Sequence, residues 1–160
     1  MFGLVGECTF NMLLQWLKVP CFHQSPLINW MQVGARVKAD FYVPTLGKVE
    51  LKSCIKADPI ISINRDNWTS EAPDLTVVVK LLDYAPDTKS RREYSFNITY
   101  CEVVGFWTGS EIKQAVNQSD AIWYLDSADV KHRWGELSGL LANAKVAMEN
   151  LNQTPPTSNS

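Results

Sequence analysis

Two carboxylates and one ammonium group stand close together in the first third of the chain, at Asp40, Glu50 and Lys52. Hard divalent cations such as Mg²⁺ take oxygen ligands in proteins, usually one or two carboxylates with waters and a substrate phosphate. A lysine beside such a cation can orient a bound water or stabilise developing negative charge. These residue types therefore indicate metal-assisted phosphoryl chemistry, provided that the fold brings the three side chains together.

A β-hairpin would place these three side chains on one face. If its loop is Thr45-Leu46-Gly47, Gly47 takes the left-handed position that three-residue loops require. Asp40 then lies opposite Lys52, and because side chains alternate along a strand, both project from the face of Glu50. The other face collects an apolar set: Phe41, Val43, Val49 and Leu51. A two-residue loop would move Asp40 to the wrong face, so the apolar pairing favours the longer loop.

The same pattern has a second interpretation, because charged residues that alternate with apolar ones are also typical of a solvated sheet face. Glu7 is open in the same way: it could join the site, or it could belong to the solvated stripe of a predicted helix. Four other side chains suit either phosphate contact or an ordinary surface: Lys38, Lys56, Asn64 and Arg65.

The elements that must position these residues follow from the periodicity of the chain. We predict helices over 4–18 and 136–151, a short helix capped by Ser110, and strands over 36–43, 48–55, 60–63, 74–82, 94–107 and 121–125. The run at 74–82 is almost continuously apolar, which is typical of a central strand buried on both faces. The first helix has one apolar face: Val5, Cys8, Met12, Leu13, Trp16 and Leu17. This order predicts an α/β fold of the α+β type, with a central mixed β-sheet flanked by helices.

Length and composition are those of an ordinary globular protein. The chain has 160 residues, 46% of them hydrophobic and 20% charged, which excludes a wholly disordered chain. We expect one domain over residues 1–151 and a disordered Pro/Ser/Asn-rich tail over 152–160. The formal net charge of −2 lacks the basic excess that is usual in nucleic-acid binders.

Other sequence features narrow the compartment and the chemistry. We expect no secretory signal and no membrane span, because the apolar N-terminal stretch lacks a basic start and is interrupted by Glu7. The four cysteines match no zinc pattern and are expected to be reduced thiols of a cytoplasmic protein, with Cys8 and Cys101 buried. His23 and His132 lie in no paired motif, which disfavours a histidine-based metal or nucleophile site.

Asp40 followed by Glu50-Leu51-Lys52 resembles the D…(D/E)-x-K signature of the PD-(D/E)xK nuclease superfamily, whose fold is the restriction-endonuclease-like core. Other segments resemble core elements of that family in the same order: Val5-Gly6-Glu7, Trp68, 73–80, 102–107 and Ser110-Glu111-Ile112. The resemblance spans residues 3–115. It departs at Ala39, where the name of the family places proline.

The resemblance implies a Mg²⁺- or Mn²⁺-dependent endonuclease that hydrolyses DNA phosphodiester bonds. Asp40 and Glu50 would ligate the metal, with the main-chain carbonyl of Leu51 as a further ligand. Lys52 would position the attacking water, and Glu7 would be an additional carboxylate near the metal. DNA is the implied partner, and so small a nuclease could act as a homodimer or within a larger nuclease complex.

Two other classes of function compete with this one. The first is a catalytically inactive module of the same fold that binds nucleic acid or protein, and the second is a structural β-rich protein without a site. The intact set of Asp40, Glu50 and Lys52 favours the enzyme, since a retired site often loses one member. The net charge of −2 favours the alternatives.

Overall fold

The structure is a computed structural model that describes residues 2–23, 39–70, 72–82, 84–86, 96–98 and 100–153. Its helices are α1 (Phe2–Leu17), α3 (Arg65–Ser70), α4 (Gly109–Ala115) and α5 (Trp134–Gln153), with a short 3₁₀ helix η1 (Ser127–Asp129). Its strands are β1 (Phe22–His23), β2 (Phe41–Val43), β3 (Gly47–Ile55), β4 (Ile60–Asn64), β5 (Leu75–Leu81), β6 (Tyr84–Pro86), β7 (Phe96–Ile98), β8 (Cys101–Thr108), β9 (Ile122–Asp126) and β10 (His132–Arg133).

The main sheet is mixed, as predicted, and has the strand order β1-β2-β3-β5-β8-β10 within the described residues. Strands β3 and β5 are parallel, whereas the other neighbours in this sheet are antiparallel. Strand β5 lies in the middle and is buried on both faces, which confirms the prediction from its apolar run. The pairs β4–β9 and β6–β7 form two separate two-stranded sheets.

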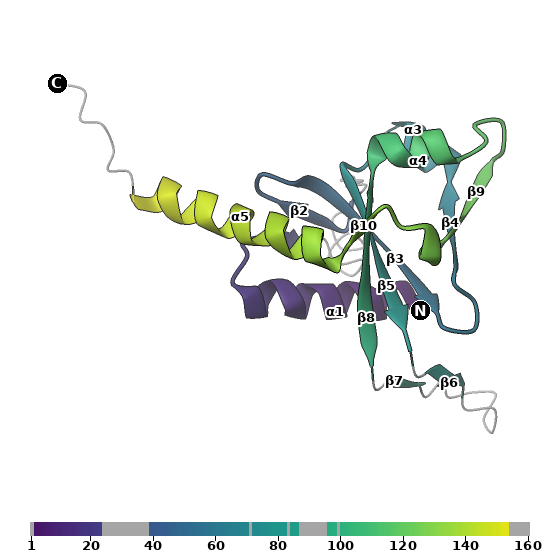
Figure 1. Cartoon of the computed structure of the whole chain (residues 1–160), viewed down its shortest axis with the longest axis horizontal. Helices are drawn as coiled ribbons and strands as arrows, with labels where there is room; N and C mark the ends of the chain where they lie inside the picture. The colour runs from purple at the N-terminus through teal and green to yellow at the C-terminus, as the bar shows by residue number, and fades with distance from the viewer. Residues whose placement is uncertain are drawn as a thin grey trace, which may run out of the picture.

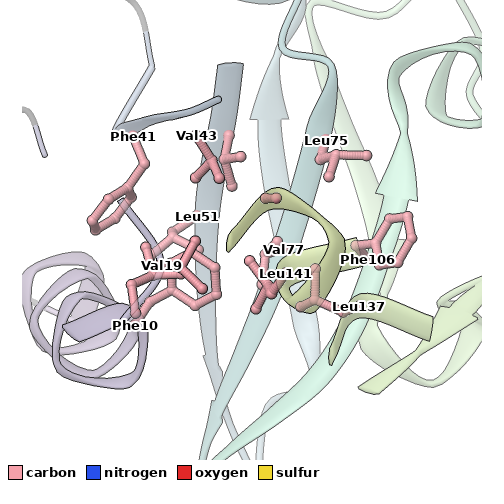
Figure 2. Packing of buried hydrophobic residues seen from close by; sticks show 13 residues of the cluster. Phe10, Val19, Phe41, Val43, Leu51, Leu75, Val77, Phe106, Leu137 and Leu141 are labelled. Atoms are coloured by element: carbon pink, nitrogen blue, oxygen red, sulfur yellow. The ribbon is translucent and has the colours of Figure 1, made fainter. Parts of the chain in front are cut away.

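The main sheet carries a hydrophobic layer on each face. Helices α1 and α5 cover one face (Figure 1), where Phe10 of α1, Leu141 of α5 and Val77 of the central strand belong to one hydrophobic cluster (Figure 2). On the other face, Val78 packs in a cluster with Trp107 and with residues of α3, α4, β4 and β9. Consecutive residues of β5 therefore serve opposite layers, as alternation along a strand requires. The observed class is α+β, with a mixed sheet flanked by helices.

The hairpin that carries the candidate site has a three-residue loop, but its register differs from the predicted one. Val43 pairs with Gly47 and Phe41 with Val49, so the loop consists of residues 44–46 rather than 45–47. The Leu46 amide donates to the Val43 carbonyl over 3.0 Å, and Thr45 and Gly47 both have positive φ, 72° and 84°. The shift changes each predicted partner by two residues. Because alternation has a period of two, the side chains of β2 and β3 stay on their predicted faces.

The prediction for the buried face of α1 was wrong in part. Met12 and Trp16 are 69% and 79% exposed, and Cys8 is exposed as well, whereas Phe10 and Leu14 are fully buried. The helix has apolar residues around most of its circumference, so periodicity alone does not select a face. The backbone contact at Gly6 accounts for the choice: a Cβ there would lie 2.0 Å from Oγ of Ser53, so only glycine lets α1 approach β3 this closely.

Several boundaries also differ from the prediction. The cap of α4 is Thr108, not Ser110, and Glu111 completes a capping box with it. The predicted strand 94–107 is divided between β7 and β8, and α3 was not predicted at all. Helix α5 extends to Gln153, so the first two residues of the predicted tail 152–160 are helical; the others lie outside the described residues. Among the described helices, none is long and apolar enough to cross a membrane.

The exposure of α1 gives a direct test of its orientation. Phe10→Ala should lower the free energy of unfolding by about 3–5 kcal/mol, because it removes a fully buried ring that packs edge-on against Phe41. Trp16→Ala should change it by less than about 1 kcal/mol, because that side chain is mostly in solvent. Urea denaturation followed by circular dichroism measures both. Equal losses would place Trp16 in a core and contradict the orientation.

Candidate active site

Asp40 is held at the point where β2 begins. The main-chain pairing of the hairpin ends at Phe41 and Val49. Just beyond this pair, the Leu51 amide of β3 donates to Oδ2 of the Asp40 side chain over 2.7 Å. The hydrogen bond ties the carboxylate to the strand that carries Glu50 and Lys52. Asp40 is thereby placed beside those residues, as the sequence predicts.

Glu50 and Lys52 are neighbours on one face of β3. Nζ of Lys52 lies 2.8 Å from Oε1 of Glu50, and the two side chains are 24% and 28% exposed for Glu50 and Lys52 respectively. The alternate residues Val49 and Leu51 are buried in the opposite layer. This separation confirms the predicted faces. This partial burial favours the site over the solvated face of the alternative interpretation, because both groups have lost most of their contact with water.

Glu7 reaches the same neighbourhood from α1. It is only 8% exposed, so the interpretation as a solvated stripe is wrong. Burial and the negative charge of Glu50 raise the pKa of Glu7, while the charge of Lys52 lowers it. The side chains therefore lie near enough for their charges to act on one another. Gly6 contributes to this arrangement, because it lets the helix approach β3 closely next to Glu7.

Negative charges lie close together at this site. Burial, followed by the negative charge of Glu50, raises the pKa of Asp40 to about 7. The Leu51 amide opposes that rise, Glu7 adds to it, and Lys52 partly offsets it. Among the described residues, the carboxylates of Asp40, Glu50 and Glu7 thus act on one another beside the ammonium group of Lys52. A carboxylate in such surroundings either keeps a proton near neutral pH or needs another cation beside it.

The donor set suits a small hard cation. Carboxylate oxygens are the preferred ligands of Mg²⁺, which often keeps several waters and uses only one or two protein carboxylates. Among the described residues, no group of three or more His, Cys, Asp or Glu side chains is already arranged to hold a metal ion. Asp40 and Glu50 would be the principal ligands, and the excess negative charge is what a divalent cation would neutralise. Leu51 lies between Glu50 and Lys52, where its main chain could contribute.

Thr76 is a neighbour of the site that the sequence pattern does not single out. Thr76 of β5 pairs directly with Glu50 of β3, and neighbours in register on parallel strands share a face. Thr76 is 0% exposed, and its buried Oγ1 has no hydrogen-bond partner among the described residues. Within the run 75–81, threonine looks like one more β-branched strand residue, so only the register with Glu50 singles it out.

The basic residues considered for phosphate contact divide into three cases. The Arg65 guanidinium donates to the carbonyls of Gln118 and Ser119, so it holds the loop before β9. Lys56 is exposed at the end of β3. Lys38 lies outside the described residues.

A second titratable cluster lies where α4, β8, β10 and α5 meet. His132 stacks on Phe106, with ring centroids 4.7 Å apart. Its Nδ1 lies 2.7 Å from Oε2 of Glu136, and its Nε2 lies 2.9 Å from Oε1 of Glu111. Because both ring nitrogens face carboxylates, the doubly protonated imidazolium satisfies both contacts. Glu111 also accepts from the amide and hydroxyl of Thr108, so the cluster joins the cap of α4 to the start of α5.

The pKa values of this cluster shift as an ion pair requires. The hydrogen bond to Glu136 raises the pKa of His132, partial burial opposes this, and Glu111 adds to the rise. For Glu111, burial acts upward, but hydrogen bonds from Thr108 and His132 outweigh it and lower the pKa. These contacts give His132 a structural role that the sequence did not indicate.

The chain was also compared with known proteins. No protein-family model, curated protein or solved structure matches it. Any conclusion about function therefore depends on the residues of the site.

The raised pKa of Asp40 predicts a pH-dependent loss of stability. A carboxyl that binds its proton more tightly when folded penalises the folded state as pH rises from about 4, and the penalty is complete above about pH 7. Without divalent metal, Asp40→Asn should therefore raise the free energy of unfolding at pH 8, by on the order of 2–4 kcal/mol, and leave it unchanged near pH 3. Urea denaturation in EDTA measures this. Asp120→Asn, at an exposed position, is the control; an equal gain there would contradict the interpretation.

The His132 cluster predicts a pH dependence at higher pH. A histidine whose folded pKa is raised contributes its full stability below about pH 6.5 and loses that contribution as pH rises through the folded pKa. Glu136→Gln should lower the melting temperature more at pH 6 than at pH 9, with a loss of about 0.5–1 kcal/mol at pH 6. Glu149→Gln is the matched control on the same helix. A loss for Glu136→Gln that is independent of pH would show that the imidazolium pair contributes nothing.

Proposed function

We propose that this chain is a divalent-metal-dependent nuclease with a restriction-endonuclease-like core, and that it hydrolyses DNA phosphodiester bonds. The observation that carries the proposal is the proximity of Asp40 to Glu50 and Lys52 at the β2–β3 hairpin, with Glu7 buried beside them. The resemblance of the sequence to the PD-(D/E)xK superfamily supports it through the same residues and through the order of the flanking segments.

The roles follow from the chemistry of each group. Asp40 and Glu50 would hold Mg²⁺ or Mn²⁺ together with the Leu51 carbonyl, and the cation would polarise the phosphoryl group and lower the pKa of a bound water. Hydrolysis joins a water oxygen to phosphorus and breaks one phosphorus–oxygen ester bond, and a proton reaches the departing oxygen. The Lys52 ammonium would hold the attacking water and stabilise the negative charge that develops on the phosphoryl oxygens.

Burial of the site supports this chemistry. Charges act more strongly where water is excluded, so a preorganised lysine does more for a developing anion there than on an open surface. Glu7 would contribute an outer carboxylate that increases the attraction for the cation. The sheet positions these groups on rigid elements, because β3 is paired on both sides, with β2 and β5.

An inactive binding module of the same fold is the second candidate. The net charge of −2 favours it, because phosphate backbones are usually met by a basic surface. The exposed side chains of Met12 and Trp16 on α1 also suit contact with a protein partner. The inactive module could bind DNA or protein, whereas the nuclease requires DNA and turnover.

Cleavage of DNA by the full chain tests the proposal. Supercoiled, linear and branched DNA should be cut in Mg²⁺ or Mn²⁺ and left intact in EDTA. Glu50→Gln and Lys52→Met should each lower the rate by about 100-fold or more, since each removes an electrostatic contact to the reacting groups.

Matched controls separate the site from general charge effects. Lys48→Met removes an exposed lysine from the same strand, and Glu102→Gln removes an exposed carboxylate from β8. Both variants should keep most of the activity. Cleavage that persists in EDTA, or in both Glu50→Gln and Lys52→Met, would refute the mechanism. Metal binding without cleavage of any substrate would favour the inactive module.

A further inference from the structure

The buried hydroxyl of Thr76 is out of keeping with its surroundings. Thr76 lies on the central strand β5 directly before Val77, Val78 and Val79, and all four residues are 0% exposed. Within the part of the chain that the structure describes, the buried Oγ1 of Thr76 has no hydrogen-bond partner. A buried hydroxyl without a partner destabilises a fold, and valine has nearly the same shape without that penalty. Packing alone therefore does not account for threonine here.

The position of this hydroxyl connects it to the candidate site. Thr76 is the in-register neighbour of Glu50 on the parallel strand β3, so the two side chains project from the same face. Adjacent strands lie about 4.8 Å apart, which is a short enough separation for a threonine hydroxyl to reach a glutamate carboxylate. Threonine can also exchange its hydroxyl and methyl positions by rotation about χ1.

The ion pair at Glu50 indicates when such a contact would be needed. In the structure, Lys52 holds Oε1 of Glu50 at 2.8 Å. The proposed function needs the same ammonium group to turn toward water and phosphate. Glu50 then loses the donor that fixes its orientation, and carboxylate ligands are normally held in place by a hydrogen bond from a neighbouring group.

We propose that Thr76 is a positioning residue, whose hydroxyl donates to the Glu50 carboxylate when Lys52 releases it and so holds Glu50 in place as a metal ligand. This role rests on the proposed function. It explains both the buried hydroxyl and its register with Glu50. It also predicts that the hydroxyl is unfavourable in the metal-free protein and favourable in the metal-bound protein.

Opposite effects on stability and metal affinity test this role. In EDTA, Thr76→Val should melt about 2–4 °C above the wild type, because it removes an unpartnered buried hydroxyl. In calorimetric titrations with Mn²⁺ and no nucleic acid, the same variant should bind at least about tenfold more weakly. Thr76→Ser keeps the hydroxyl and should retain affinity within about threefold, a margin well inside the tenfold loss.

Ser53→Ala is the matched control. Oγ of Ser53 is also buried and finds no hydrogen-bond partner in the described segments, but Ser53 lies on the opposite face of β3, against Gly6. Its removal should leave Mn²⁺ affinity unchanged. Equal loss of affinity in Ser53→Ala and Thr76→Val would show a general effect of the sheet and overturn the role of Thr76.

Each remaining outcome is also decisive. Unchanged Mn²⁺ affinity in Thr76→Val overturns the inference while leaving the nuclease proposal intact. A Thr76→Val protein that melts lower or fails to fold overturns it too, because the hydroxyl would then stabilise the metal-free state. Thr76→Ser binding as weakly as Thr76→Val would show that the hydroxyl is not the relevant group. A wild-type protein that takes up no Mn²⁺ refutes the proposed function itself, and the role of Thr76 with it.

Discussion

The hydrogen bond from the Leu51 amide to the Asp40 carboxylate links the backbone of the sheet to the candidate site. A strand donor that loses its neighbouring strand needs another acceptor, and a side chain fills that need here. The same contact places one carboxylate beside the strand that carries two more charged groups. Burial and repulsion from Glu50 then raise the pKa of Asp40 to about 7. The hydrogen bond to Oδ2 of Asp40 thus satisfies a main-chain donor of β3 and also brings a negative charge close to Glu50.

The two hydrophobic layers explain how the sheet tolerates that concentration of charge. Strand β5 is buried on both faces and pairs with β3 through seven residues, so β3 is firmly held on the side away from β2. The charged side chains project from one face of β3, while Val49 and Leu51 remain in the layer under α1 and α5. The hydrophobic side chains buried in the two layers stabilise the fold against the repulsion between the carboxylates. A site with unfavourable electrostatics in the absence of its ligand is common in enzymes, where stability is traded for binding.

The arrangement of the hairpin could be predicted from the sequence better than that of the elements packed against it. The common face of Glu50 and Lys52 was correct although the hairpin register was wrong, because alternation depends only on whether a shift is odd or even. The buried face of α1 was not predictable from periodicity, since apolar residues surround the helix and the close approach at Gly6 is a tertiary contact. Glu7 had two possible interpretations, and Thr76 was not singled out, because the contacts of both residues are tertiary. Their significance comes from neighbours on other strands, which no local pattern contains.

The loop between β2 and β3 has a consequence for how this hairpin can diverge among related chains. A shift of the pairing register by two residues returns every side chain to its original face, whereas a shift by one exchanges the charged and apolar faces of a whole strand. The loop itself is under no such constraint, because residues added between the two strands leave their pairing unchanged. The loop of residues 44–46 can therefore vary in length while Phe41 still pairs with Val49, whereas a one-residue slip of that pairing would turn the apolar side chains of β2 out of the hydrophobic layer.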